Sequence, residues 1–203
     1  KNQIIEVHNR PYLVELINNK LKNKVITLFL HNNPLDMKGS KSIKEREMLL
    51  SRVEKVYCVS KYIKNQFLLG LKNDSKKVVV LYNGINRTLN TLPKKNKLVI
   101  FVGRIVKEKG IHLYVNAVKK ISKNYQDWNF KIIGSPKLGE NKFDDRFSRE
   151  IAEKFEKIGP NTEVTGFISS EKLKNIMKKA SIIIIPSTWQ EPFGLVAAEA
   201  MSH

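Results

Sequence analysis

Short runs of apolar, β-branched residues recur along the chain, and stretches of mixed polarity separate them. Eight of these runs have the length and composition of buried strands. They are Ile4–Val7, Val25–Leu30, Lys55–Val59, Val78–Tyr82, Leu98–Val102, Phe130–Ile133, Glu163–Thr165 and Ser181–Ile185. Strands that alternate with helices are typical of βαβ units, in which helices cover a parallel sheet. The pattern therefore predicts an α/β fold built on parallel sheets.

Two of the separating stretches show the apolar spacing of amphipathic helices. The first stripe consists of Ile111, Tyr114, Val115, Val118 and Ile121, and the second of Phe147, Ile151, Phe155 and Ile158. The second stripe ends at Gly159-Pro160, a pair that is typical of the carboxyl end of a helix. Each predicted helix therefore has an apolar face that can cover a sheet.

The segment from Asn86 to Lys97, NRTLNTLPKKNK, is polar, contains a proline and has no apolar periodicity. Such a composition is typical of a linker. We therefore predict a first α/β domain over residues 1–87, a linker over 88–97 and a second α/β domain over 98–203. Two such domains leave a cleft between them, and open parallel sheets bind ligands at the carboxyl ends of their strands.

Polar residues gather where the predicted strands end. In the first domain His8-Asn9-Arg10 and His31-Asn32-Asn33 follow two successive strands. In the second domain Gly103-Arg104 and Gly134-Ser135 follow two strands, and a loop that contains Glu191 follows the last strand. Because the carboxyl ends of parallel strands share one edge of a sheet, that edge of each domain is predicted to carry the chemistry.

Two glutamates near the end of the sequence, in EPFGLVAAEAMSH, stand in an otherwise apolar context. From about Gly194 the residues favour a helix whose single polar side chain is Glu199. A buried carboxylate must be paired or hydrogen-bonded, because burying it alone costs several kcal/mol. Glu191 precedes this helix, whose first amides are suited to an anion. The alternative is structural: Glu191 caps the helix and Glu199 pairs with a neighbouring lysine.

A basic turn, GRIVKEKG from Gly103 to Gly110, joins a predicted strand to a predicted helix. Its first glycine permits a tight turn, Arg104 offers a planar fork of donors to a phosphate, and Lys109 adds a second positive charge. The glycine spacing differs from that of a P-loop, and Lys109 is not followed by Ser or Thr. A solvated basic turn without a ligand is the alternative.

Four motifs, FVGRIVKEKGIHLYVNAV, IIGS, VTGFIS and EPFGLVAAEAMS, follow one another within residues 98–203. In order and spacing they resemble the motifs of the retaining, nucleotide-sugar-dependent glycosyltransferases of group 1, family four. In the first half, IIEVHNRP, ITLFLHNNP, VSK and VLYNGIN resemble the acceptor domain of that family from its middle onward. The resemblance implies a GT-B architecture, in which two Rossmann-like domains face a cleft, here truncated at both ends.

By position, the resemblance implies a donor site in the second domain. Arg104 and Lys109, which follow Gly103, would hold the diphosphate of the donor. Glu199 would bind the ribose hydroxyls, and Glu191 would contact hydroxyls of the transferred sugar. These roles agree with the chemistry of the residues, because carboxylates accept from paired hydroxyls and fixed cations stabilise a departing diphosphate.

The remaining implied contacts are of two kinds. Backbone groups would face the donor, those of Phe193, Gly194 and Leu195 toward the sugar and phosphates, and those of Gly166 and Phe167 beside the nucleobase. His8 matches a histidine near the acceptor and the reaction centre. The resemblance therefore implies His8 and Glu191 as the catalytic residues.

Two positions depart from the family's pattern. The loop after the second strand of the donor domain usually carries a second glycine, where this chain has Gly134-Ser135-Pro136-Lys137. Asn86 stands in place of the Asp that usually follows the Asn-Gly pair. The first departure concerns the conformation of the loop, and the second concerns the junction between the domains.

The histidines and the one adjacent acidic pair give no metal-site pattern. The alternative for His8 and His31 is that they are hydrogen-bonded residues at strand ends, and His112 and His203 are expected to be surface or packing residues. No spacing matches a zinc ligand set, and Asp144-Asp145 is explained as the start of the following helix. We therefore expect no metal and no cofactor, with the nucleotide sugar as a co-substrate.

At 203 residues and 41% hydrophobic content the chain can bury a substantial core, and no apolar run approaches the roughly 18 residues of a membrane-spanning helix. Because the sequence starts at Lys1 and stops at His203 inside an apolar helix, we expect an internal fragment of a longer protein. The single cysteine, Cys58, lies in a predicted strand without a disulfide partner, which suits a reducing compartment.

The formal net charge of +18 is unevenly distributed. Residues 1–97 carry 20 Lys and Arg against 7 Asp and Glu, a net of +13, whereas residues 98–203 carry 17 against 12, a net of +5. A basic half suits a phosphorylated substrate, an anionic membrane surface or a nucleic acid. The lysines are dispersed and few aromatic residues lie among them, which disfavours nucleic acid and leaves compositional drift as the alternative.

The leading hypothesis is a metal-independent, retaining hexosyl- or related glycosyltransferase. It would move a sugar from a nucleotide sugar to a hydroxyl of a sugar or lipid-linked acceptor, in the synthesis of cell-envelope polysaccharide, lipopolysaccharide or glycolipid. We expect it in the cytoplasm, with the basic half at the cytoplasmic face of an anionic membrane. The rival hypotheses are a basic nucleic-acid or membrane-surface binding module without catalysis, and a fragment that is inactive alone.

Overall fold

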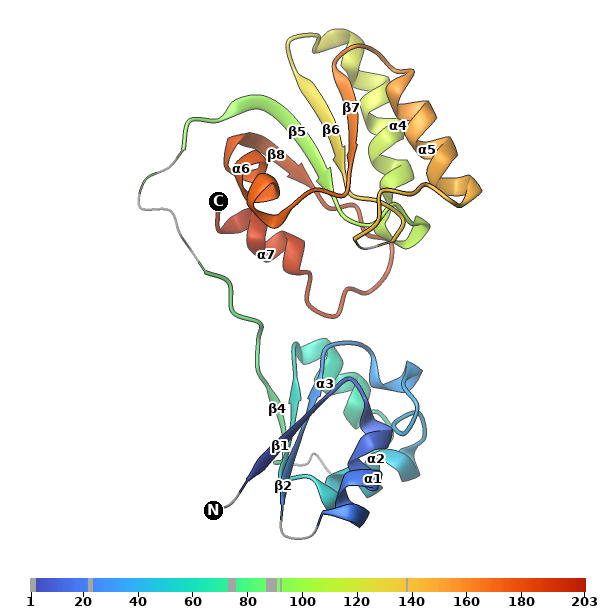
Figure 1. Ribbon diagram of the computed structural model, residues 1–203, viewed down its shortest axis with the longest axis vertical. Coiled ribbons are helices and arrows are strands. Elements are labelled where there is room, and N and C mark those ends of the chain that lie inside the picture. Colours follow the sequence, from blue (N-terminus) through green and yellow to red (C-terminus); the bar gives the residue numbers. More distant parts are fainter. Residues whose placement is uncertain (1–2, 22–23, 73–75, 87–90, 92, 138) are drawn as a thin grey trace. The chain divides into compact units, whose positions relative to one another are not determined.

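The computed structural model describes residues 3–21, 24–72, 76–86, 91, 93–137 and 139–203 (Figure 1). The chain divides into two compact units, Lys1–Gly84 and Ile85–His203. Each unit contains a four-stranded parallel sheet. The predicted α/β class is therefore confirmed.

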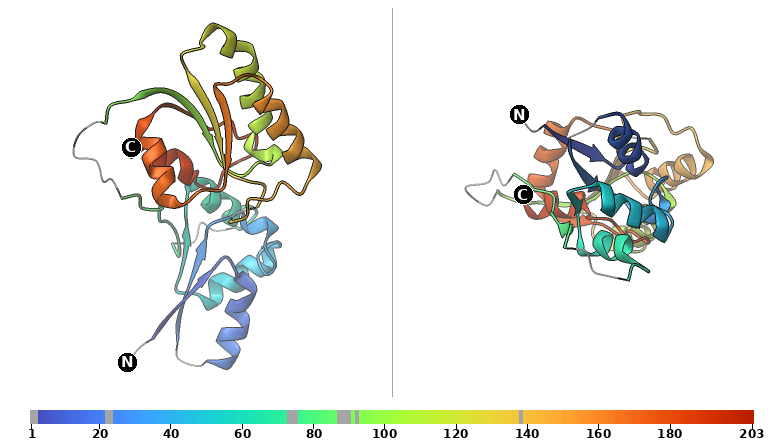
Figure 2. Two further views of the ribbon diagram at one scale, coloured as in Figure 1. Left: turned by 45° about the horizontal axis from the view of Figure 1, so that its top comes forward. Right: turned by 90° about the horizontal axis from the view of Figure 1, so that it is seen from below.

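The described part of the first unit is a parallel sheet with three α-helices and one short 3-10 helix. Its strands are β1 (Ile4–His8), β2 (Val25–Leu30), β3 (Lys55–Cys58) and β4 (Val78–Val80), in that order across the sheet. The connections contain α1 (Pro11–Lys20), the 3-10 helix η1 (Pro34–Asp36), α2 (Ile43–Arg52) and α3 (Lys61–Leu68). Each successive strand lies on the same side of the strand before it, and the connections between parallel strands are right-handed. The three α-helices therefore cover one face of the sheet (Figures 1 and 2).

Among the described residues of this unit, one charged side chain, that of Arg46, is buried in the core. Arg46 of α2 is 2% exposed, among apolar strand and helix residues. Its guanidinium donates to the backbone carbonyl oxygens of Ser40 (3.1 Å), Lys41 (2.8 Å) and Leu69 (2.5 Å). Burial lowers the pKa of Arg46, and the three carbonyl oxygens replace the water that the charge has lost. Arg46 thereby fixes the segment before α2 to the end of α3.

The second unit has the strand order β7-β6-β5-β8. Its strands are β5 (Asn96–Val102), β6 (Asn129–Ile133), β7 (Thr162–Gly166) and β8 (Ala180–Ile184). Its helices are η2 (Lys107–Lys109), α4 (Ile111–Ile121), η3 (Ser122–Asn124), α5 (Arg146–Glu156), α6 (Ser170–Lys179) and α7 (Leu195–Met201). The strands β6 and β7 are added on one side of β5, and β8 is then added on the other side.

This reversal places helices on both faces of the second sheet. Right-handed crossovers put α4 and α5 on one face and α6 on the other (Figures 1 and 2). The core accordingly has two parts, one under α4 and α5 that includes Phe101 and Phe155, and one under α6 that includes Ile100 and Met177. The sheet is therefore buried on both sides, as its nearly continuous apolar strands require.

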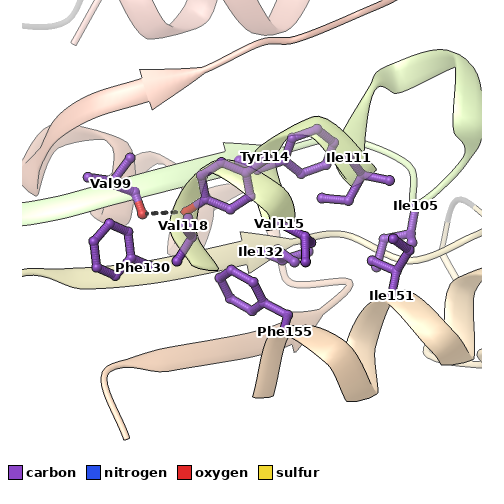
Figure 3. Close-up of a cluster of buried hydrophobic side chains, with 11 residues drawn as sticks. Val99, Ile105, Ile111, Tyr114, Val115, Val118, Phe130, Ile132, Ile151 and Phe155 are labelled. Atoms are coloured by element: carbon purple, nitrogen blue, oxygen red, sulfur yellow. Dashed lines mark hydrogen bonds between the residues drawn. The ribbon is translucent and has the colours of Figure 1, made fainter. Parts of the chain in front are cut away.

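Tyr114 is the polar member of the cluster under α4 and α5, which Figure 3 shows. Its hydroxyl donates to the backbone carbonyl oxygen of Val99 in β5 at 3.0 Å. Burial raises the pKa of Tyr114, so the hydroxyl stays a neutral donor. This contact and the surrounding apolar side chains hold α4 against β5 and fix the turn between them.

All eight predicted strands and both predicted amphipathic helices are confirmed, with shifts at their ends. The predicted strand Val78–Tyr82 is too long, because β3, which pairs with β4, ends at Cys58 opposite Val80. The strand β5 begins at Asn96, within the predicted linker 88–97, and residues 87–90 and 92 lie outside the described residues. None of the helices that the structure describes has the length and apolar character needed to cross a membrane.

Candidate functional site

The carboxyl ends of β5 and β8 lie side by side in the second unit, where the strand order reverses (Figure 1). Open α/β sheets bind ligands in the crevice at such a point. Residues 103–110 follow β5, residues 134–145 follow β6, residues 167–169 follow β7 and residues 185–194 follow β8. The predicted site residues of the second domain lie in these segments, at the end of β7 and in α7.

Gly103 and Gly134 allow two of these segments to run in contact. Gly134 has φ +136°, and a Cβ placed on it would lie 2.0 Å from the backbone oxygen of Gly103. The Gly103 N–H donates to Ile133 O at 3.0 Å, and the Gly134 N–H donates to Gly166 O at 2.9 Å. Only glycine fits at position 134, so the strand ends meet as a closely packed backbone surface.

Ser135 lies in the segment 134–137, where the resemblance led us to expect a second glycine, and its contacts are well defined. Its side chain is 3% exposed. Its hydroxyl donates to Lys137 O at 2.5 Å, and its backbone oxygen accepts from the Ile105 N–H at 3.1 Å. The serine therefore closes the turn after β6 and ties it to the turn after β5.

A cavity of about 190 Å³ opens at this edge of the sheet. Its lining is Val102, Gly103, Arg104, Ile133, Gly134, Ser135, Phe167, Ile168, Leu173 and Val196. Three of the predicted site residues, Gly103, Arg104 and Phe167, thus border one hollow. A larger hollow of about 390 Å³ lies at the opposite, amino-terminal edge of the same sheet and has none of the predicted site residues in its lining.

Asn141 holds the backbone of Phe167 from the loop after β6. Its side-chain oxygen accepts from the Phe167 N–H, and its side-chain nitrogen donates to Phe167 O at 3.2 Å. Gly166 has φ +68°, and a Cβ there would lie 2.6 Å from the Asn141 oxygen. Asn141 therefore engages both backbone polar groups of Phe167, whose side chain is exposed.

Lys109 and Glu191 form an ion pair at the end of β8. The Lys109 Nζ lies 2.5 Å from Glu191 Oε1, and the two side chains are 22% and 23% exposed. The Ser187 hydroxyl donates to the same carboxylate oxygen at 2.8 Å. The Lys109 ammonium also lies over the ring of Trp189, 5.3 Å from its centroid. The pair is thus enclosed by the loop that follows β8.

A close backbone contact brings these two residues together. Gly110 has φ +68°, and a Cβ on it would lie 1.8 Å from the backbone oxygen of Pro186. Beside it, the Thr188 N–H donates to Glu108 O at 2.9 Å. The turn after β5 and the loop after β8 therefore pack directly against each other, and this contact holds Lys109 beside Glu191.

The surroundings of Glu191 keep its carboxyl group ionised. Burial raises its pKa, but hydrogen bonds from Lys109, Ser187 and Trp189, together with the Lys109 charge, outweigh burial and lower the pKa below its ordinary value of 4.5. At neutral pH the site therefore contains a carboxylate, which accepts hydrogen bonds and donates none.

Part of the stability of the second unit should depend on pH through Glu191. Because its folded-state pKa is lowered, its stabilising contribution is complete above about pH 4.5 and is lost as the pH falls through the lowered value. We expect the melting temperature of full-length Glu191→Gln to lie furthest below wild type near neutral pH, with the gap narrowing in acid. Thermal denaturation measures this gap. Glu156→Gln, at an exposed position of α5, should show no such trend, and a constant gap for Glu191→Gln would contradict the expectation.

Glu199 and Arg104 have no ion-pair partner within the described part of the chain. Arg104 is exposed, and the half-buried Glu199 carboxylate lies in α7, the helix expected from about Gly194. Gly194 precedes α7 with φ +81° and makes no side-chain cap, while Leu195 begins the helix and is 48% exposed. The expected alternative, a lysine partner for Glu199, is not observed among these residues.

The first unit places its two histidines together at the carboxyl edge of its own sheet. His8 ends β1 and His31 directly follows β2. The His8 Nδ1 lies 3.0 Å from the His31 Nε2, and the His8 Nε2 lies 3.4 Å from the Glu6 carboxylate. Within the described residues no group of three or more His, Cys, Asp or Glu is arranged to hold a metal ion.

One known protein family matches the second unit. The family described as "Glycosyl transferases group 1" matches residues 85–203, more than half of the chain. The chain belongs to this family. The matched residues are those of the second unit, which contains Arg104, Lys109, Glu191 and Glu199.

Individual relatives match residues of both units of the chain. It is 33% identical over 190 residues to an uncharacterized glycosyltransferase of Methanocaldococcus jannaschii, covering 92% of this chain and 49% of the relative. It is 21% identical over 217 residues to the lipopolysaccharide 1,2-N-acetylglucosaminetransferase of Salmonella typhimurium, covering 100% of this chain and 53% of that protein. The chain spans about half the length of the curated relatives it matches.

The fold is similar to that of Anabaena HepE, whose structure was solved in complex with UDP. The TM-score is 0.74 at 18% identity, and the match covers 98% of this chain and 57% of that chain. The predicted membership in the group 1 glycosyltransferases and the predicted GT-B fold, with two Rossmann-like parallel-sheet domains, are confirmed.

Sequence reasoning missed three residues that shape the candidate site. Ser187 and Trp189 contact the Lys109–Glu191 pair from just upstream of Glu191, so their closeness in sequence is a signal that was available. Asn141 gives no such signal, because it lies 26 residues before Phe167 in a polar loop without a pattern.

Proposed function

We propose that this chain is part of a metal-independent glycosyltransferase that moves a hexosyl or related sugar from a nucleotide sugar to an acceptor hydroxyl, with retention of the anomeric configuration. The observation that carries the proposal is the Lys109–Glu191 pair at the point where the sheet order reverses. Membership in the group 1 family supports it. The pair supplies a fixed cation and a fixed acceptor of hydroxyl hydrogens in one place.

The cations are proposed to bind the diphosphate of the donor. Arg104 is exposed and offers a planar fork of donors, and Lys109 has three N–H donors of which Glu191 needs one. As the bond between sugar and diphosphate breaks, negative charge grows on the leaving oxygen, and fixed cations stabilise that charge. The similar HepE was solved in complex with UDP, which supports a nucleoside diphosphate as the ligand.

The carboxylates are proposed to bind hydroxyl groups. Glu191 would accept from hydroxyls of the transferred sugar, and Glu199 from the ribose hydroxyls. The half-buried Glu199 supports this role: it forms no ion pair with any described residue, and a carboxylate in that position gains most from a ligand that donates. The largely apolar cavity beside Phe167 would take the nucleobase, with Asn141 holding the backbone beneath it.

The acceptor side is proposed to lie in the first unit, where His8 is the implied residue. The acceptor would be a sugar or lipid-linked molecule of the cell envelope, and the similarity to a lipopolysaccharide transferase supports this class. The net charge of +13 on residues 1–97 favours a location at the cytoplasmic face of an anionic membrane. In the proposed front-face step, the diphosphate leaves, the acceptor oxygen bonds to the same face of the sugar, and the acceptor proton passes to the leaving phosphate.

A thermal-shift panel of nucleoside diphosphates and nucleotide sugars on the full-length protein tests the donor. A ligand at 100 times its dissociation constant stabilises the folded state by about 2.7 kcal/mol. The nucleotide of the donor should therefore raise the melting temperature more than the other nucleotides in the panel. Arg104→Ala should lose this response, and Lys107→Ala, from the same basic turn, should keep it. A protein that responds to no nucleoside diphosphate, or a product with inverted configuration by NMR, would contradict the proposal.

A further inference from the structure

Three ionisable side chains form a hydrogen-bonded row at the carboxyl edge of the first sheet. Glu6 and His8 stand two residues apart on β1, so both side chains project from the same face. The Glu6 Oε2 lies 3.4 Å from His8 Nε2, and His8 Nδ1 lies 3.0 Å from His31 Nε2. Each ring nitrogen of His8 is therefore next to a polar atom, and the row runs from Glu6 through His8 to His31.

The sheet holds the rings in this arrangement. His8 is the register partner of Phe29, and their rings stack at 4.6 Å with 9° between their planes. Phe29 stacks in turn on Tyr57 of β3 at 4.7 Å. A ring that lies flat against its neighbour cannot rotate freely, so the two His8 nitrogens keep their directions toward Glu6 and His31.

Asn9 fixes the position of His31 through hydrogen bonds. Its backbone has φ +51°, in the left-handed region that asparagine tolerates at a cost. In this conformation its side-chain oxygen accepts from the His31 N–H at 2.8 Å, and its own N–H donates to Phe29 O at 2.9 Å. A strained residue between the two histidines thus holds the end of β1 to the end of β2.

The row allows only one placement of hydrogens when both histidines are neutral. Between His8 Nδ1 and His31 Nε2, one nitrogen carries a hydrogen and the other accepts it. If His8 Nδ1 carried it, His8 Nε2 would turn a lone pair toward the Glu6 carboxylate, which is repulsive. His8 is therefore protonated on Nε2, His31 is protonated on Nε2, and His31 Nδ1 is left with a lone pair.

That last nitrogen is available to a ligand. Among the residues that the structure describes, none hydrogen-bonds to His31 Nδ1. Burial of His31, followed by its proximity to His8, lowers the pKa of His31, which keeps this ring neutral and its lone pair open. A neutral nitrogen of fixed direction accepts a hydrogen bond from a hydroxyl group.

We propose that Glu6, His8 and His31 form a relay that fixes the tautomer of both histidines and presents His31 Nδ1 to a sugar hydroxyl of the substrate. Glu6, His8 and Asn9 are positioning residues in this relay, so His8 has a positioning role in place of the catalytic role that the resemblance implies, and His31 is the residue that contacts the substrate. The identity of the ligand rests on the proposed glycosyltransferase function, whereas the hydrogen placement rests on the geometry of the first unit alone.

The tautomers can be read directly by NMR on full-length protein labelled with ¹⁵N-histidine, at a pH where both rings are neutral. Two-bond ¹⁵N–¹H correlations should show His8 and His31 both protonated on Nε2. Glu6→Ala should convert His8 to a mixture of tautomers, because the acceptor that fixes its hydrogen is gone. Glu47→Ala, which removes an exposed glutamate of α2, should leave both signals unchanged. A His8 or His31 protonated on Nδ1 in the wild-type protein would overturn the relay.

Transfer assays on the same variants test the role in binding. Glu6→Ala and Asn9→Gly should each lower kcat/KM for the acceptor roughly 3- to 10-fold, the size expected from one hydrogen bond. Glycine permits the backbone of Asn9, so Asn9→Gly removes only the side-chain contact, and Asn9→Asp should restore the rate. Unchanged kcat/KM in both Glu6→Ala and Asn9→Gly would overturn the positioning role.

The two readouts separate this inference from the proposed function. A protein that shows the predicted tautomers but transfers no sugar supports the relay and counts against the proposed function. A protein that transfers sugar while His31 is protonated on Nδ1 supports the function and overturns the relay.

Discussion

Replacing Lys109 by methionine is expected to lower kcat/KM for the nucleotide sugar about 100-fold or more in the full-length protein, the size of effect when one charge-stabilising group is lost from an active site. Methionine keeps an unbranched chain of similar size but removes the charge. In the proposed reaction the leaving diphosphate would lose a fixed cation, and the Glu191 carboxylate loses its partner at 2.5 Å. Steady-state kinetics with the donor identified by thermal shift measures the change.

Lys107→Met is the matched control for this variant. Lys107 lies in the same 3-10 turn and is exposed, so its loss should leave kcat/KM unchanged. The effects of Lys109→Met and Glu191→Gln should be non-additive in the double variant, because both remove the same ion pair. Wild-type activity in Lys109→Met would show that the pair is only structural.

Gly110→Ala is expected to destabilise the second unit by about 3 kcal/mol or more, in the upper range for single substitutions. The left-handed backbone at φ +68° costs an alanine roughly 1–2 kcal/mol. In addition, the new Cβ would lie 1.8 Å from the Pro186 oxygen, so the turn after β5 must separate from the loop after β8. Calorimetry of the full-length protein measures the stability, and kcat/KM should fall with it because Lys109 is the preceding residue.

Gly139→Ala separates the two causes of this effect. Gly139 also has a left-handed backbone, φ +83°, but a Cβ there would meet nothing within 4 Å. This variant should therefore lose only the roughly 1–2 kcal/mol of backbone strain and keep its activity. Equal destabilisation by the two alanines would mean that the contact with Pro186 contributes nothing.

The elements of the fold could be predicted from the sequence because burial on both faces leaves a local signal. The run Leu98–Val102, in the sheet with helices on both faces, is apolar and buried at every position, and the stripe from Ile111 to Ile121 repeats at the helical period. The ends of elements were less accurate, because pairing sets them. Tyr82 falls outside β4 since β3 ends earlier, and Asn96 joins β5 since it pairs with Ala180.

The candidate site was predicted as a set of residue types, without its contacts. Arg104, Lys109, Glu191 and Glu199 stand in short motifs, so their chemistry could be read locally. The sequence treated the two glutamates as one pair and the two cations as another, whereas the structure pairs Lys109 with Glu191 and shows no ion pair of Arg104 or Glu199 with a described residue. The residue assignments themselves stay predictions until the donor and the variants are measured.

The sequence by itself determined the α/β class, the order of strands and helices, the basic first half and the residues that carry charge at the strand ends. These are properties of local pattern and composition. Only the tertiary structure decided that Lys109 meets Glu191 and that His8 meets His31, across 82 and 23 residues respectively. Strand order and close glycine contacts set such distances, and both depend on how segments far apart in the chain pack together.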